Sequence, residues 1–137
     1  MGLRRVAREC ALQMLYQLDV GKVTPGDIQE SFWNMNEQPE TVRKFACQLF
    51  TGTVARLEEI DRTIQKHTQH WRLKRMAAVD RNILRVAVYE LLSGAKTPGT
   101  VVINEALEIA KKFSTHESAQ FVNGVLDSVK DELIQRG

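Results

Sequence analysis

The sequence lacks long apolar runs and is poor in cysteine. No apolar run approaches the roughly 18 residues that a membrane span requires. The opening residues lead into an amphipathic pattern instead of the unbroken apolar stretch of a signal peptide. The two cysteines, Cys10 and Cys47, lie far apart without a CxxC motif, so neither a disulfide framework nor a cysteine zinc site is indicated. We therefore expect a reduced, cytoplasmic protein.

Motifs for catalysis are also missing. The sequence contains no GxGxxG, GxxxxGK[ST] or GxSxG pattern. Both cysteines fall on or beside apolar helical positions, which favours buried, inert thiols over nucleophiles. His67 and His70 have a spacing that suits one helix face, but no cysteine or further histidine lies nearby, so a solvated or phosphate-facing pair is favoured over a metal site. We expect no enzymatic activity, no metal and no cofactor.

Hydrophobic residues recur with helical spacing through nearly the whole chain of 137 residues. No segment alternates with period two for long enough to form a sheet, and no glycine-rich linker divides the chain. The pattern predicts one all-α domain, residues 1–137, with about seven helices in two helical halves that pack directly on each other. The N-terminal helical half is expected over about 1–68 and the C-terminal half over about 69–137.

Several local features are specific enough to be checked. One long helix is predicted from Pro39 to beyond Ile64, with Gly52 in its apolar stripe allowing a close helix crossing. The segment 76–92 is apolar around most of its circumference, which predicts a central helix. Only a strip of three residues on this helix is expected to face solvent or a partner: Arg81, Arg85 and Tyr89. Ser114 and Glu117 have the spacing of a capping box and predict the start of the last helix.

Positive charge is concentrated in two places although the net charge is only +2. Seven basic residues and one acidic residue lie between Arg62 and Arg85, and a second basic cluster opens the chain. Such clusters suggest a footprint for a polyanion, or else helix faces that are simply solvated. The two clusters strengthen the first interpretation only if folding brings them to one side.

The first helix carries a second stripe opposite its apolar one. Arg5, Arg8, Leu12 and Tyr16 follow each other around this face. Exposed bases with an aromatic ring suit a single-stranded nucleic acid, because arginines neutralise phosphates and the ring stacks on a base. Alternatively, Leu12 and Tyr16 pack beneath a neighbouring helix.

A second aromatic residue, Phe121, falls off the core stripe of the last helix, next to Asn123 and Gly124. Phe121 either enters a second helix contact or is an exposed anchor at a binding surface. An Asn-Gly pair is unfavourable within a helix, so it needs a local reason. The two candidates are close backbone approach and recognition of a base by the Asn123 amide.

Four blocks of the sequence together resemble the NusB family of bacterial transcription antitermination factors. These blocks are residues 4–16, 80–91, 102–113 and 121–126, and they occur in the family's order. The resemblance implies an all-helical fold of two small bundles that binds the boxA segment of ribosomal RNA leader transcripts. It further implies a heterodimer with the ribosomal protein NusE, which loads onto elongating RNA polymerase and suppresses termination.

The resemblance also assigns residues. The family's RNA contacts correspond here to Arg4, Arg5, Arg8 and Tyr16, and Phe121 and Asn123 are added as candidate RNA contacts in the last block. The NusE-facing side corresponds to Asp80, Glu117 and Phe121. Two departures from the family pattern, Val6 within the arginine run and Gln120 before Phe121, each put one phosphate contact in doubt. The resemblance assigns no role to the basic residues Arg72, Lys74 and Arg75.

Two other functions fit the same pattern. NusB-like domains also serve as RNA-recognition domains of ribosomal RNA cytosine methyltransferases, although no cofactor-binding domain follows within these 137 residues. Alternatively, the chain is a homodimeric helical interaction module whose dimer covers the basic face. A dimer that RNA cannot dissociate would favour this last interpretation.

Overall fold

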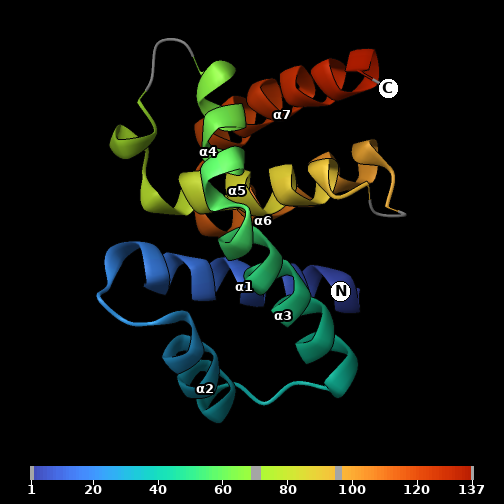
Figure 1. The fold of residues 1–137 in the computed structure, drawn as a ribbon. Coiled ribbons are helices and arrows are strands. Elements are labelled where there is room, and N and C mark those ends of the chain that lie inside the picture. The colour runs from blue at the N-terminus through green and yellow to red at the C-terminus, as the bar shows by residue number, and fades with distance from the viewer. Residues whose placement is uncertain (1, 69–71, 95–96, 137) are drawn as a thin grey trace.

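The computed structural model describes residues 2–68, 72–94 and 97–136 (Figure 1). Within these ranges the chain is helical and has no strand, which confirms the predicted fold class. No helix in this part of the chain is long and apolar enough to cross a membrane. In chain order the elements are α1 (Leu3–Val20), α2 (Pro25–Met35), α3 (Glu40–Ala55), α4 (Leu57–Lys66), the 3-10 turn η1 (Leu73–Arg75), α5 (Ala78–Leu92), α6 (Gly99–Phe113) and α7 (His116–Arg136).

The predicted long helix after Pro39 is divided in two. α3 ends at Ala55, and Arg56, with φ −113° and ψ 22°, leaves the helical region before α4 begins at Leu57. Helical spacing of the apolar residues continues through this break, so the sequence pattern alone did not reveal it. The break has a consequence for packing, because Ile60 and Ile64 of α4 join the core of the C-terminal bundle.

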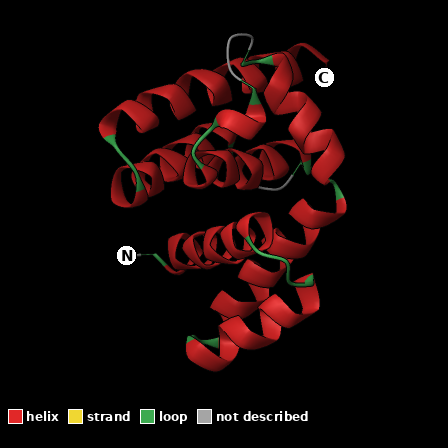
Figure 2. Ribbon diagram, turned by 90° about the vertical axis from the view of Figure 1, so that its left-hand side faces the viewer, coloured by secondary structure: helices red, strands yellow, loops and turns green. Residues whose placement is uncertain are grey.

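The helices form two bundles, one above the other in Figure 2, and each bundle surrounds a hydrophobic core. α1, α2 and α3 enclose the N-terminal core, in which Met14 and Phe50 are fully buried. α4, α5, α6 and α7 enclose the C-terminal core. Leu12 of α1 belongs to the C-terminal core and Val86 of α5 to the N-terminal core, so α1 and α5 join the two bundles. The change from one core to the other falls at Arg56, earlier than the division expected near residue 68.

Gly52 of α3 packs directly against Tyr89 of α5. A Cβ built on Gly52 would overlap the end of the Tyr89 ring, so any larger residue here would require Tyr89 to shift. The expected close helix crossing is therefore confirmed, and it locks Tyr89 between the two cores.

The strip of α5 that was expected to be free is occupied by ion pairs. Arg81 Nη2 lies 2.7 Å from Asp19 Oδ2 at the end of α1. Arg85 donates from Nε and Nη2 to the two carboxylate oxygens of Asp61 on α4, at 2.8 and 2.9 Å. The expectation of a free strip was wrong because these arginines, with Tyr89, connect α5 to the surrounding helices.

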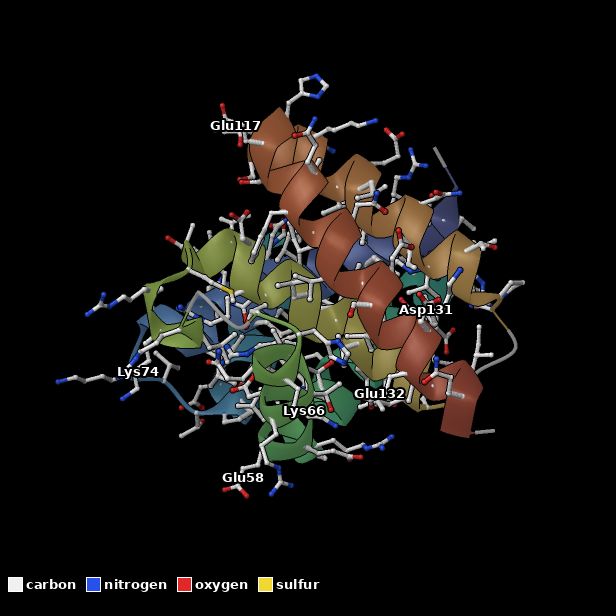
Figure 3. All side chains as sticks on the ribbon, turned by 90° about the horizontal axis from the view of Figure 1, so that it is seen from above. Glu58, Lys66, Lys74, Glu117, Asp131 and Glu132 are labelled. Carbon is white, nitrogen blue, oxygen red and sulfur yellow. The ribbon has the colours of Figure 1, made fainter. Side chains whose placement is uncertain are left out.

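The last helix is capped by Thr115 and not by the expected capping box of Ser114 and Glu117. α7 begins at His116, and the backbone N–H of Ser118 donates to Thr115 Oγ1 at 3.0 Å. Thr115 therefore caps the helix in place of Ser114. Glu117 makes no capping bond and is exposed at the start of α7 (Figure 3).

Candidate nucleic-acid and partner interface

The second face of α1 is covered by the C-terminal bundle. Leu12 is only 4% exposed and packs into the C-terminal core, and Arg8 is also 4% exposed. Of the two interpretations of this face, packing beneath a neighbouring helix is confirmed for Leu12, and the expectation that Arg8 is exposed was wrong. A polar stripe on a helix indicates a solvent-exposed face only when no second layer of helices covers that face. Here α5 and α6 cover the polar stripe of α1.

Arg8 is a buried structural residue. Its Nε and Nη2 atoms donate to the two carboxylate oxygens of Glu90 on α5, at 2.7 and 2.9 Å. Its Nη1 lies 3.7 Å from Glu105 Oε1 on α6, and its guanidinium lies 5.5 Å from the Phe45 ring centre. The side chains of Arg8 and Glu90 are 5% and 4% exposed, so Arg8 is not accessible to an RNA phosphate and its assignment as an RNA contact is corrected.

Arg5 and Arg4 lie progressively closer to solvent. Arg5 donates from Nε and Nη2 to the carboxylate of Glu105, at 3.1 and 2.6 Å, and its side chain remains 30% exposed. The hydrogen bond from Arg5 lowers the pKa of Glu105 below its ordinary 4.5. Arg4 is exposed, and its guanidinium lies 4.6 Å from the centre of the Phe45 ring. Arg4 is thus available to a polyanion, and Arg5 is available at the edge of its ion pair.

Tyr16 lies at the other end of α1 and is 40% exposed. Twelve residues of α-helix separate it from Arg4, which corresponds to about 18 Å along the axis. Of the two interpretations that the sequence left open for Tyr16, exposure to solvent is the one observed. A ligand that contacts both residues must therefore follow most of the length of α1.

Asp80, Glu117 and Phe121 lie together at one depression of about 310 Å³, which we call the α5–α7 hollow. Asp80 Oδ2 accepts a hydrogen bond from Ser118 Oγ at 2.8 Å. The other oxygen, Oδ1, is buried and has no hydrogen-bond partner among the described residues. The hollow thus combines a half-satisfied carboxylate, an exposed glutamate and a partly buried ring; its lining is completed by Arg75, Met76, Ala77, Thr115 and Ser118.

Asn123 lies on α7 outside the lining of the α5–α7 hollow and is half-buried. A Cβ built on the neighbouring Gly124 would meet no atom within 4 Å, so close approach of another part of the described chain does not explain this glycine. That half of the sequence interpretation is corrected. The candidate role of Asn123 toward a base stays a prediction.

A larger depression, which we call the α1–η1 hollow, was not predicted. It has a volume of about 790 Å³ and lies where the end of α1 meets α4, η1 and α5. Its acidic residues, Asp19 and Asp61, are distant in sequence, so no local motif revealed them; the only sequence signal was the charge cluster. Its lining is Asp19, Asp61, Gln65, Arg72, Leu73, Lys74, Arg81 and Arg85.

Cys10 and His67, which could in principle act in catalysis or bind a metal, lie in surroundings that indicate a structural role. Burial raises the pKa of the Cys10 thiol to about 11, so the thiol is protonated at neutral pH. His67 lies within hydrogen-bond distance of Ser128 Oγ at 2.7 Å and Glu132 Oε1 at 3.1 Å, while His70 lies outside the described residues. Within the described residues no three metal-binding side chains are grouped.

Together, the two-bundle fold and these surfaces define an all-helical protein that exposes arginines, aromatic rings and carboxylates on its surface. Residues 5–131 match the model of the NusB family, and the chain belongs to that family. It is 56% identical over 133 residues to the transcription antitermination protein NusB of Koribacter versatilis (strain Ellin345), covering 96% of this chain and 91% of that protein. It is 49% identical over 136 residues to the corresponding protein of Solibacter usitatus (strain Ellin6076), covering 97% and 92%.

Solved structures agree with this assignment. The NusB chain in a crystal structure of the antitermination factors NusB and NusE in complex with double-stranded RNA superposes with a TM-score of 0.87 at 29% identity, covering 95% of this chain and 97% of that one. The NusB of T. maritima gives a TM-score of 0.82 at 33% identity, covering 94% and 91%. Family membership identifies the chain as a transcription antitermination factor, a class of regulatory proteins and not of enzymes.

Proposed function

We propose that this protein binds the boxA segment of ribosomal RNA leader transcripts together with NusE, and that the heterodimer joins elongating RNA polymerase to suppress termination. The family assignment supports RNA and transcription antitermination as the setting. A NusB chain of the same fold, 29% identical, is known in a complex with NusE and double-stranded RNA. In this role the protein is an adaptor: it brings RNA and protein surfaces together and performs no bond chemistry.

The α5–α7 hollow carries the NusE part of the proposal. Asp80 contributes a carboxylate to the lining of this hollow, and its negative charge favours a partner that brings basic or amide donors to the rim. The exposed Glu117 adds negative charge at the rim, and Phe121 offers an apolar surface beside it. This combination fits a partner surface with basic or amide donors around an apolar patch.

The RNA part rests on a different set of residues. Arg4 and the exposed edge of Arg5 supply cations at the start of α1, and Tyr16 supplies an open ring at its end. Phe121 and Asn123 on α7 are the proposed contacts near the partner. Arg8 contributes indirectly, because its ion pair with Glu90 fixes α1 against the C-terminal bundle.

The direct test is a mobility-shift titration with boxA RNA, a scrambled strand of the same composition and the boxA duplex, each with and without NusE. The proposal expects boxA RNA to bind more tightly than the scrambled strand and NusE to increase its affinity. Equal affinity for boxA and scrambled RNA in the presence of NusE would contradict it. The duplex separates recognition of single-stranded bases from recognition of helix shape.

Replacement of the half-satisfied carboxylate tests the partner surface separately. Asp80→Lys is expected to weaken NusE association at least tenfold, because it places a cation against the expected donors. The substitution also removes the hydrogen bond from Ser118, so association is measured at a temperature where circular dichroism shows the variant to be folded. Association is measured by titration calorimetry. Asp127→Lys makes the same charge change at an exposed position of α7 outside the hollow and serves as the control. Undiminished association of Asp80→Lys would refute the placement of NusE at this hollow.

A further inference from the structure

The charges around the α1–η1 hollow are unevenly compensated. Arg81 is held by Asp19 and by the carbonyl oxygens of Leu73 and Met76, which accept from its Nη1 at 2.9 and 3.1 Å. Arg85 is held by Asp61. These two pairs account for both carboxylates of the lining, and two further cations remain at the rim.

Arg72 and Lys74 are these two remaining cations. Both are exposed, and neither has an ion-pair or hydrogen-bond partner through its side chain among the described residues. Figure 3 shows the Lys74 side chain extending away from the body of the molecule. Inside the α1–η1 hollow the arginines are neutralised by aspartates, whereas the exposed Arg72 and Lys74 leave its rim positively charged. A positively charged rim attracts an anion.

The lining also indicates which kind of anion. Among the described residues that line the hollow, Leu73 is the single apolar one. The core of a protein interface normally contains several apolar or aromatic anchors, and the described lining offers only this one. A flexible polyanion needs cations and an aromatic ring nearby, and that requirement is met here.

The position of the rim connects it to the proposed RNA contacts. Tyr16 precedes Asp19, which lines the hollow, by less than one turn of α1. On the other side, η1 contributes Lys74 to this hollow and Arg75 to the α5–α7 hollow, where Phe121 lies. Figure 1 shows the end of α1, η1 and the start of α5 at the same end of the molecule. The basic turn thus lies between the two aromatic residues.

We propose that Arg72 and Lys74 bind backbone phosphates of an RNA strand that passes from Tyr16, over the rim of the α1–η1 hollow, toward Phe121. This inference rests on the proposed RNA-binding function and adds to it a phosphate-binding segment outside α1 and α7. The contact neutralises phosphates and reads no bases, so it strengthens binding of any sequence that reaches the turn.

The experiment is a salt titration of RNA affinity for the double variant Arg72→Gln/Lys74→Gln in the presence of NusE, using boxA RNA with several flanking nucleotides on each side. Each lost phosphate contact reduces the slope of log affinity against log salt by about 0.7 for a single strand. We expect the slope to fall by about 1.4 for two contacts. The preference for boxA over scrambled RNA should stay at its wild-type value.

A matched control separates local contact from net charge. Arg62→Gln/Lys111→Gln also removes two exposed cations, from α4 and α6, outside both hollows, and should leave the slope unchanged. An unchanged slope for Arg72→Gln/Lys74→Gln, or an equal fall in both double variants, would overturn the inference while the proposed function stands. Weaker association with NusE alone, with RNA affinity unchanged, would assign the turn to a protein carboxylate and also overturn it. Failure of the wild type to bind RNA would overturn both proposals.

Discussion

Three arginines within the first two turns of α1 have three different surroundings. Arg8 is buried against Glu90, Arg5 lies at a partly exposed ion pair with Glu105, and Arg4 is exposed over the Phe45 ring. The sequence placed them in one basic cluster, because spacing along a helix does not show which side a second bundle covers. Their roles in stability and in RNA binding should therefore separate.

The buried ion pair gives a stability prediction. Arg8→Ala leaves the Glu90 carboxylate, only 4% exposed, without its partner and should lower the free energy of unfolding by about 3–5 kcal/mol. Urea denaturation followed by circular dichroism measures this change. Arg8→Met/Glu90→Leu removes both charges and should recover most of the loss. A loss below about 1 kcal/mol for Arg8→Ala would contradict the buried pair.

The ion pairs of α1 also predict acid sensitivity. The hydrogen bond from Arg5 lowers the pKa of Glu105. Burial opposes ionisation of Asp19, but hydrogen bonds from Arg81 and Asn82 and the nearby arginine charges outweigh it, so the pKa of Asp19 is lowered too. A carboxylate with a lowered pKa stabilises the folded state above its unfolded pKa and loses this contribution as the pH falls.

Stability is therefore expected to decrease as the pH drops below about 4.5 and through the lowered folded-state values. Urea unfolding midpoints over a series of pH values from neutral to strongly acidic measure this decrease. Glu105→Gln removes one of the two groups and should make the decrease shallower. A Glu105→Gln variant with the same acid dependence as the wild type would show that the Arg5 pair does not contribute.

At the scale of elements, the sequence predicted only one of the two interfaces that α1 forms. Its apolar stripe predicted the contact with the N-terminal core, and this contact is present through Ala7, Met14 and Leu15. Its polar stripe also faces protein, because α5 and α6 supply Glu90 and Glu105 as partners. Ion pairs between residues about 80 and 100 positions apart leave no periodic signal, so sequence spacing did not reveal this second interface.

The crossing of α3 and α5 gives a prediction at this scale. Gly52→Ala places a methyl group into the Tyr89 ring and should destabilise the fold by about 1–3 kcal/mol, although alanine favours a helix more than glycine does. Gly26→Ala in α2 is the control, since a Cβ there meets no atom within 4 Å. Thermal denaturation of the two variants measures the difference. Equal or higher stability of Gly52→Ala would mean that Tyr89 moves aside freely.

For the whole molecule, helical periodicity was sufficient to predict the all-α class, and the resemblance to the NusB family predicted the two bundles. The division of the bundles at Arg56 was not predictable, because Ile60 and Ile64 keep the same spacing while they change cores. The α5–α7 hollow was predictable only through resemblance, since Asp80 and Phe121 come from different blocks. Only the basic residues of the α1–η1 hollow could be recognised in the sequence. Asp19 and Asp61, which neutralise part of this charge, are distant in sequence and come together only in the folded chain.

Different arginines thus stabilise the fold and face the proposed RNA. Arg8, Arg81 and Arg85 are held by carboxylates and connect helices to each other. Arg4 and the exposed edge of Arg5 stay at the surface, where the account places RNA. Recognition should therefore weaken without loss of the fold when the outer arginines are replaced.

The most direct measurement is a fluorescence-anisotropy titration of boxA RNA with the NusE heterodimer at several salt concentrations, comparing the wild type with Arg4→Gln/Arg5→Gln. The account predicts weaker binding and a salt slope reduced by about 0.7 for each lost phosphate contact, in a variant whose circular dichroism spectrum matches the wild type. Unchanged affinity together with an unchanged slope would remove the start of α1 from the RNA-binding surface and contradict the account.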